Sequence, residues 1–219
     1  MDEHRLTVSR SARYYTLGQA GRSLREAWFL CHGYGELAQP FLRRFESLDD
    51  GTRLLVAPEG LSRFYLDSSG GRQAARVGAS WMTREDRDAE ISDYLAYVDA
   101  VRDQCLASPT HGVTIRILGF SQGAATAARW AAHGRVAPAE VILYGGILPP
   151  ELEPRVLKAR HAGLRITYVV GDRDDFLDHA SQATQAATCE AAGLITRVIR
   201  FEGGHRIDTS ALRQLEGIP

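Results

Sequence analysis

The sequence is poor in cysteine, in net charge and in long apolar runs. Its three cysteines are far apart and no Cys-x-x-Cys pair occurs, so we expect neither a disulfide framework nor a zinc site. The 26 Lys and Arg residues are balanced by 27 Asp and Glu residues, which offers nucleic acid no electrostatic partner. No apolar run approaches the length needed to cross a bilayer, so we expect no stable membrane insertion.

The N-terminus also lacks the apolar segment of a secretory signal, since Met1-Asp-Glu-His-Arg5 is largely charged. We therefore expect a cytoplasmic protein. No linker, repeat or change of composition divides the chain, which predicts a single domain over residues 1–219. No feature of the sequence specifies an oligomeric state.

Short apolar runs alternate with segments of helical period along the chain. This alternation predicts an α/β fold with a mostly parallel central sheet flanked by helices. The segment 59–80 shows neither period and is expected to be irregular, as either a functional loop or lid or a solvated surface excursion. Strands are predicted over residues 11–17, 27–31, 53–57, 113–118, 141–144, 165–170 and 195–201, the last of them at an edge because it carries polar residues.

The stretch Gly119-Phe-Ser-Gln-Gly123 lies between a predicted strand and a predicted helix. A G-x-S-x-G sequence in this context is typical of a nucleophile elbow, a tight turn that holds its serine in a strained conformation. A Cβ atom two residues before or after the serine would clash with the turn, and glycine at both positions avoids this clash. The alternative is an ordinary loop in which Ser121 only caps the helix.

A serine hydroxyl needs a base that takes its proton and an acid that orients the base. Among the seven histidines, His205 follows the last predicted strand on a flexible glycine pair, and we predict that it is the base. The order nucleophile, acid, histidine is that of the α/β-hydrolases. Four aspartates that follow the preceding strand are candidates for the acid, and strand alternation does not choose among them: Asp172, Asp174, Asp175 and Asp178.

An oxyanion hole needs two hydrogen-bond donors aimed at the developing charge. We predict the backbone N–H of Gln122, directly after the nucleophile, and that of Tyr34 in a glycine-rich loop; an ordinary glycine turn is the alternative for this loop. Apolar side chains near the strand ends suit an acyl or alkyl group, so we expect a small uncharged ester or acyl substrate and neither metal nor cofactor. The predicted substrate-binding residues are Trp81, Met82, Ile147 and Phe176.

Taken together, these motifs resemble the phospholipase/carboxylesterase family of α/β-hydrolases, which includes acyl-protein thioesterases. The matching stretches run from about residue 27 to 205: His32-Gly-Tyr-Gly-Glu36, Ala57-Pro-Glu-Gly60, Ser80-Trp-Met82, Gly119-Phe-Ser-Gln-Gly123, Gly171-Asp-Arg-Asp174 and Gly203-Gly-His205.

The resemblance implies a carboxylesterase or thioesterase without a large cap domain. It also implies that Ser121 is the nucleophile, His205 the base and Asp174 the acid, with the amides of Tyr34 and Gln122 in the oxyanion hole. Two features depart from the family. Asp175 stands where the family usually has proline, and the segment before Trp81 is rich in glycine and arginine, so the family's chain-length preference does not carry over.

Two other classes of protein compete with this interpretation. Gly33-Tyr34-Gly35 opens a G-x-G-x-x-A pattern after a strand, and Glu59 follows near the end of the next strand, as in a dinucleotide-binding fold. Pro40 fits that pattern poorly. A hydrolase fold that only binds and does not catalyse is the other class, although an intact set of serine, acid and histidine argues against it.

Overall fold

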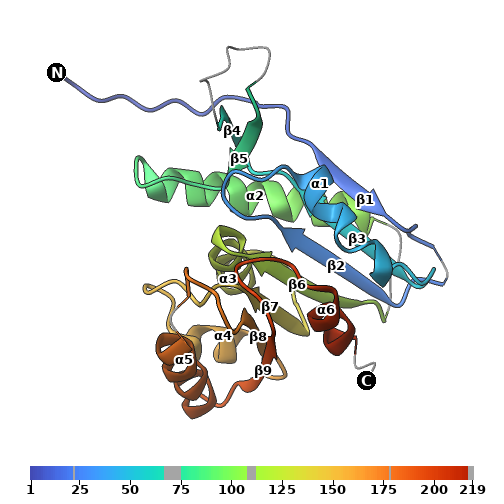
Figure 1. Cartoon of the computed structure of the whole chain (residues 1–219). Helices are drawn as coiled ribbons and strands as arrows, with labels where there is room; N and C mark the ends of the chain where they lie inside the picture. Colours follow the sequence, from blue (N-terminus) through green and yellow to red (C-terminus); the bar gives the residue numbers. More distant parts are fainter. Residues whose placement is uncertain (22, 67–74, 108–111, 178, 217–219) are drawn as a thin grey trace.

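A computed structural model of the chain describes all residues except 22, 67–74, 108–111, 178 and 217–219. At its centre is a seven-stranded sheet in the order β1-β3-β2-β6-β7-β8-β9 (Figure 1). All neighbouring strands in it are parallel except β1 and β3. The strands are β1 (Tyr14–Leu17), β2 (Glu26–Cys31), β3 (Arg53–Pro58), β6 (Thr114–Phe120), β7 (Glu140–Tyr144), β8 (Arg165–Gly171) and β9 (Ile195–Phe201).

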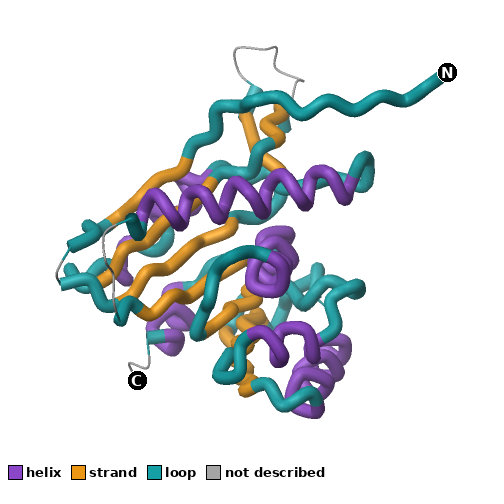
Figure 2. The backbone as a smooth tube through the Cα atoms, turned by 180° about the vertical axis from the view of Figure 1, so that it is seen from behind, coloured by secondary structure: helices purple, strands orange, loops and turns teal. Residues whose placement is uncertain are grey.

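Helices cover both faces of the sheet (Figures 1 and 2). Successive side chains of a strand point to opposite faces, so Phe29 packs in one apolar cluster and Trp28 in the other. The first face is covered by α2 (Arg87–Cys105), α3 (Gln122–His133), α4 (Pro154–Arg160) and α5 (His179–Ala191). The second is covered by α1 (Ala38–Arg43), which the short 3-10 helix η1 (Glu46–Leu48) follows, and by α6 (Thr209–Leu215). The predicted fold class is confirmed, and β9 is an edge strand as expected.

The segment 59–80 is not the irregular loop that the sequence predicts. It contains an antiparallel pair, β4 (Ser62–Tyr65) and β5 (Val77–Ser80), while residues 67–74 lie outside the described part of the chain. The Gly35 N–H donates to the Ala79 carbonyl, and the Ala79 N–H donates to the Glu36 carbonyl, at 2.9 and 3.1 Å. The hairpin is therefore built onto the glycine-rich loop that follows β2.

The register of the parallel strands brings their carboxyl ends to one edge of the sheet. Cys31 at the end of β2 pairs with Gly119 of β6, and Phe120 pairs with Tyr144 at the end of β7. Gly171 at the end of β8 pairs with Phe201 at the end of β9. In such sheets, ligands bind beyond the carboxyl ends of the strands. The loops that carry the predicted site residues all leave the sheet at this edge.

The three cysteines are free thiols. Cys31 and Cys189 are buried, as the sequence predicts, and burial raises the pKa of the Cys31 thiol to about 12. A thiol with so high a pKa is a poor nucleophile at neutral pH because it forms almost no thiolate. Within the described residues, the structure contains no helix of the length and apolar character that a membrane span requires.

Candidate active site

Ser121 forms the turn between β6 and α3. Its backbone has φ 54° and ψ −117°, a conformation that only glycine adopts without strain. The Ser121 N–H donates to the Tyr144 carbonyl at 2.9 Å, which ties the turn to the end of β7. The side chain stands at the N-terminal end of a 12-residue helix, where the helix dipole favours negative charge. This geometry is that of a nucleophile elbow.

The two glycines that flank the serine are required by close backbone contacts. A Cβ atom on Gly119 would lie 2.0 Å from the Gly123 carbonyl oxygen. One on Gly123 would lie 2.1 Å from the Cys31 carbonyl oxygen and 2.7 Å from that of His32. The N-terminus of α3 therefore packs directly on the strand end where the glycine-rich loop begins.

We predict that Gly123→Ala lowers both stability and activity. Its methyl group would meet backbone rather than a movable side chain, so overpacking should cost about 1–3 kcal/mol of unfolding free energy. Chemical denaturation and ester turnover measure the two effects. Gly163→Ala, at a glycine with open space around its Cβ position and no positive φ, controls for the general cost of losing a glycine. Equal stability of Gly123→Ala and wild type would contradict the close packing.

His205 and Asp174 form a close pair beside the elbow. Nδ1 of His205 lies 2.8 and 3.0 Å from the two carboxylate oxygens of Asp174, whose side chain is 1% exposed. With this carboxylate as its partner, Nδ1 carries a proton and donates it in a hydrogen bond to Asp174. Nε2 is then unprotonated and able to accept a proton. The His205 ring packs between Phe120 and Phe176, with both ring centroids 4.8 Å away. Phe120 directly precedes Ser121, so the imidazole lies next to the elbow.

The other candidate acids do not face the histidine. Asp172 accepts a hydrogen bond from the Gly203 N–H at 2.7 Å and so holds the loop that carries His205. Asp175 is exposed, and Asp178 lies outside the described residues. Of the three aspartates that the structure describes here, Asp174 alone contacts the imidazole.

Two glycines, Gly145 and Gly146, lie between Ser121 and His205. The sequence analysis did not predict this role for them. A Cβ atom on Gly145 would lie 2.9 Å from Cε1 of His205, and one on Gly146 would lie 3.1 Å from the Ser121 carbonyl oxygen. Both residues directly follow the buried strand β7. Only residues without a side chain leave room here for the imidazole and the elbow together.

The two predicted oxyanion-hole amides have no acceptor among the described residues. The neighbouring amides are used: the Gly35 N–H donates to Ala79 and the Gly33 N–H donates to the Glu36 carboxylate at 2.8 Å. The amides of Tyr34 and Gln122 remain available within the described part of the chain. A Cβ atom on Gly33 would lie 3.1 Å from the Phe120 ring, so the glycine-rich loop lies against the elbow.

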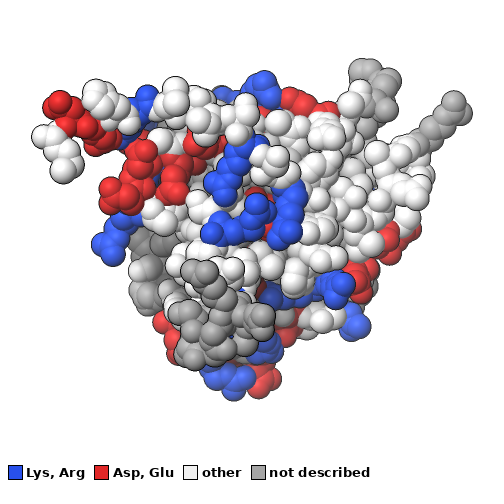
Figure 3. All heavy atoms as spheres, turned by 90° about the horizontal axis from the view of Figure 1, so that it is seen from above, with Lys and Arg blue, Asp and Glu red and all other residues white. Residues whose placement is uncertain are grey.

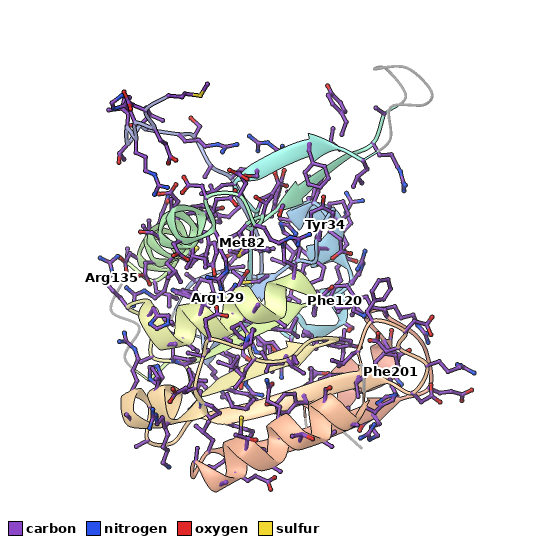
Figure 4. The ribbon with its side chains drawn as sticks, turned by 90° about the vertical axis from the view of Figure 1, so that its left-hand side faces the viewer. Tyr34, Met82, Phe120, Arg129, Arg135 and Phe201 are labelled. Atoms are coloured by element: carbon purple, nitrogen blue, oxygen red, sulfur yellow. The ribbon has the colours of Figure 1, made fainter. Side chains whose placement is uncertain are left out.

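The Gln122 side chain holds the neighbouring segment in place. Its Oε1 accepts from the Trp81 N–H at 3.1 Å, and its Nε2 donates to the Met82 carbonyl at 2.8 Å. The Ser80 hydroxyl joins this network by donating to the same carbonyl at 2.9 Å. The start of α3 is thus anchored to the segment that follows β5. Figure 4 shows Tyr34 and Met82 between the helix that carries Arg129 and the hairpin above it.

The four residues expected to bind substrate differ in exposure. Phe176 is 81% exposed and contacts His205, while Met82 and Ile147 are half-buried. Trp81 is 1% exposed and its indole N–H donates to the His32 carbonyl at 2.8 Å. Trp81 therefore supports the loops from within the core, and the other three are the better placed to meet a substrate.

His32 is buried and links three loops. Its Nε2 accepts the Gly60 N–H at 2.9 Å, and its Nδ1 donates to the Gly33 carbonyl at 2.8 Å. Burial lowers the pKa of His32, although the Gly33 carbonyl and the carboxylates of Glu36 and Glu59 oppose the change. The ring is neutral in this arrangement, because a proton on Nε2 would displace the Gly60 N–H.

Because His32 is held neutral in the folded protein, we predict that the protein loses stability in mild acid. Unfolded histidine has a pKa of about 6.5, so below that pH the unfolded chain binds a proton that the folded chain excludes. The free energy of unfolding should fall as the pH drops from about 6.5 toward the lowered pKa of folded His32. Chemical denaturation of the wild type and of His32→Asn across this pH range measures the free energy of unfolding. His133→Asn, at an exposed position, is the matched control. An equal pH dependence in wild type and His32→Asn would contradict this role of His32.

Glu59 is committed to structural contacts rather than to a nucleotide. Its carboxylate, 1% exposed, accepts from Arg13 at 2.6 Å and from Arg63 at 3.2 Å. It also accepts the Ala38 N–H at 3.3 Å. An acid saturated in this way does not serve as the ribose acceptor of a dinucleotide site. The structure therefore does not favour the dinucleotide-binding interpretation.

Comparison with known proteins agrees with this geometry. The serine hydrolase (FSH1) family matches residues 50–214, a range that includes Ser121, Asp174 and His205. Esterase FUS5 of Gibberella fujikuroi is 29% identical over 128 residues, which are 58% of this chain and 51% of that protein. The chain thus spans about half the length of this curated relative.

Solved structures share the fold at low sequence identity. Esterase PE8 superposes with a TM-score of 0.69 and 20% identity, covering 95% of this chain and 97% of that one. Acyl-protein thioesterase 2 of Zea mays gives a TM-score of 0.68 and 18% identity, with 94% and 96% covered. A phospholipase/carboxylesterase of Dyadobacter fermentans gives 0.66 and 17%, with 96% and 97% covered.

The sequence resemblance, the fold and the family match all agree. A likeness to the phospholipase/carboxylesterase α/β-hydrolases was predicted from the motifs around Ser121 and His205, and it is confirmed. The structure adds a strained elbow and a paired histidine and aspartate at the same edge of the sheet. The chain belongs to the serine hydrolase (FSH1) family and has the α/β-hydrolase fold.

Proposed function

We propose that this protein hydrolyses carboxylic esters through an acyl-enzyme intermediate on Ser121. The observation that carries the proposal is the His205–Asp174 pair, 2.8 Å long, packed beside a serine in the strained backbone conformation of an elbow. A serine, an aspartate and a histidine that follow one another in this order along the chain support acyl transfer rather than simple binding. A non-catalytic binding module would have no need of a buried acid that orients a histidine.

Each residue has one role in the proposed reaction. The Ser121 oxygen attacks the ester carbonyl carbon while Nε2 of His205 takes the hydroxyl proton. The tetrahedral intermediate then breaks its bond to the alcohol oxygen, and His205 returns the proton to that oxygen. A water molecule then attacks the acyl carbon while His205 takes its proton. The bond from that carbon to the Ser121 oxygen breaks, His205 returns the proton to this oxygen, and the acid is released. Asp174 holds the imidazole and stabilises its cation throughout.

The amides of Tyr34 and Gln122 are proposed to bind the negative oxygen of the intermediate. Preorganised donors of this type typically contribute about 10²–10³ in rate. The hydrogen bonds of the Gln122 side chain fix the start of α3, and those of Gly35 fix the loop that carries Tyr34. The site therefore supplies nucleophile, base and charge stabilisation from the chain itself.

The expected substrate is a small, uncharged ester. Met82 and Phe176, which meet solvent near the elbow, are apolar, and the Arg87 and Arg129 side chains nearby are paired with Glu151. Basic and acidic side chains both appear on the face drawn in Figure 3, and the net charge is −1. We propose no nucleic-acid partner on this basis.

A panel of aryl esters with graded acyl chains tests the proposed function. We expect turnover of short and medium uncharged acyl esters, unchanged by a strong chelator, because acyl transfer by this set of groups needs no metal. A matched thioester in the panel tests whether sulfur leaving groups are also accepted. Failure to hydrolyse any uncharged ester, or loss of activity on chelation, would contradict the proposal.

The three free cysteines bear on the proposed compartment. Cys31 and Cys189 are buried and unreactive, but Cys105 is partly exposed, and a free thiol of that kind persists in a reducing environment and tends to oxidise outside it. We propose that the protein acts in the cytoplasm, and localisation of the tagged chain by microscopy or fractionation tests this. Recovery in an oxidising compartment would contradict it.

A further inference from the structure

Three aromatic rings form a row that runs from the core to the surface beside the nucleophile. The His205 ring lies between the rings of Phe120 and Phe176, with both ring centroids 4.8 Å from its own. Exposure rises along this aromatic row: Phe120 is 6% exposed, the His205 side chain 16% and Phe176 81%. The row therefore ends in a phenyl ring whose outer face is open to solvent.

Packing of the core does not explain the position of Phe176. A phenylalanine that is 81% exposed buries little apolar surface, so it adds little hydrophobic stabilisation to the fold. The Phe176 N–H donates to Oδ1 of Asp174 at 2.9 Å, and Nδ1 of His205 lies 3.0 Å from the same oxygen. One carboxylate thus positions both the imidazole and the residue whose ring covers it.

The exposed ring lies on the side of the site where the leaving alcohol has to be. In the proposed reaction, Nε2 of His205 returns a proton to the alcohol oxygen, so that oxygen must come within about 2.6–3.2 Å of Nε2. The acyl carbon is bonded to the Ser121 oxygen at this stage. The alcohol is therefore the part of the substrate that comes nearest to His205 and to the ring that packs on it.

The free face of Phe176 suits a flat apolar group. Aromatic rings pack in offset or edge-to-face arrangements with centroids about 4.5–7 Å apart, and the rings of Phe176 and His205 already lie at such a distance. Another ring on the outer face would continue the aromatic row at the same spacing. A saturated group of equal size can cover this face but lacks the electrostatic preference of stacked rings.

We propose that Phe176 binds the alcohol part of the ester and gives the site a preference for alcohols that carry an aromatic ring. The inference rests on the proposed ester hydrolysis at Ser121 and names the part of the substrate that Phe176 contacts. It predicts that kcat/KM is about tenfold higher for benzyl acetate than for methyl acetate. It also predicts a higher kcat/KM for benzyl acetate than for cyclohexylmethyl acetate. The three alcohols are similarly weak acids, so leaving-group reactivity does not decide the comparison.

Removal of the phenyl ring tests the contact with the alcohol. Phe176→Ala should lower kcat/KM for benzyl acetate about tenfold more than for methyl acetate, whereas Phe176→Tyr keeps a ring and should keep the preference. The ratio of kcat/KM for methyl butyrate and methyl acetate should be the same in Phe176→Ala as in wild type, because the acyl chain does not meet this ring. Phe176→Leu replaces Phe176→Ala if that variant fails to fold.

Tyr65→Ala is the matched control. Tyr65 is another exposed aromatic residue, at 59%, but it lies in β4 of the hairpin. Among the described rings, those of Phe120 and Phe176 are the ones that pack on His205. The preference for benzyl acetate should therefore be the same in Tyr65→Ala and wild type.

The outcomes separate the two proposals. A folded wild-type protein that hydrolyses no ester overturns the proposed function, and the contact of Phe176 with it. Turnover of methyl acetate with no preference for benzyl acetate, or with a preference for the cationic acetylcholine, overturns the contact alone. An equal loss for benzyl and methyl acetate in Phe176→Ala also overturns it, because the ring would then act only through His205.

Discussion

Ser121→Ala is expected to abolish ester hydrolysis while the fold remains intact. Removing the nucleophile of such a triad lowers kcat by about 10⁴–10⁶, with residual catalysis from binding and the oxyanion hole. The fold should survive because the Ser121 side chain makes no hydrogen bond within the described residues, and because the backbone bond to Tyr144 does not need the hydroxyl.

Steady-state kinetics on an acetyl aryl ester measure the loss, and circular dichroism confirms the fold. A comparison of stability adds a second measurement. Alanine relieves none of the strain of φ 54°, whereas glycine does, so Ser121→Gly should be inactive and more stable than Ser121→Ala. A folded Ser121→Ala protein with near-normal turnover would rule out Ser121 as the nucleophile.

Asp174→Asn is expected to lower kcat by about ten-thousandfold. An amide at this position can accept from Nδ1 only in one orientation, can favour the wrong tautomer of His205 and carries no charge to stabilise the imidazolium. The pair is tight, at 2.8 Å, and Asp174 is nearly inaccessible to solvent, so water does not replace the lost interaction easily. The measurement is kcat on the same aryl ester with the variant shown to be folded.

Asp172→Asn and Asp175→Asn are the matched controls. Asp172 accepts the Gly203 N–H, which an asparagine can still do, and Asp175 is exposed. Both changes should therefore reduce kcat far less than Asp174→Asn. A larger loss from Asp175→Asn would show that the acid lies one position further along the loop.

The strands and the elbow were predictable because their signals are local. Ala27 to Cys31 is a short apolar run and β2 is buried between β3 and β6, as such a run predicts. The chain order of Ser121 and His205 at strand ends also followed from the sequence. Asp174 was chosen by family resemblance alone, because four nearby aspartates look equivalent until the His205 ring is placed.

The hairpin and the position of Trp81 depended on long-range contacts instead. β5 contains Gly78, which breaks a strand pattern, yet a Cβ there would lie 2.4 Å from the Gly35 carbonyl oxygen, so the glycine is required by the neighbouring loop. Trp81 near an active-site motif suggested substrate contact, but its indole bonds to His32 inside the core. The hydrogen bond from the Leu148 N–H to the Gln185 side chain joins residues 37 positions apart and leaves no local signal.

Labelling with a fluorophosphonate tests the proposed triad without any assumption about the substrate, since only a serine activated by a base reacts at an appreciable rate. Intact-mass analysis followed by peptide mapping should show one adduct per chain, on Ser121. The adduct should be absent from Ser121→Ala and should form far more slowly in His205→Gln. No adduct on the folded wild-type protein, or an adduct at another residue, would contradict the assignment of Ser121, His205 and Asp174 as a catalytic triad.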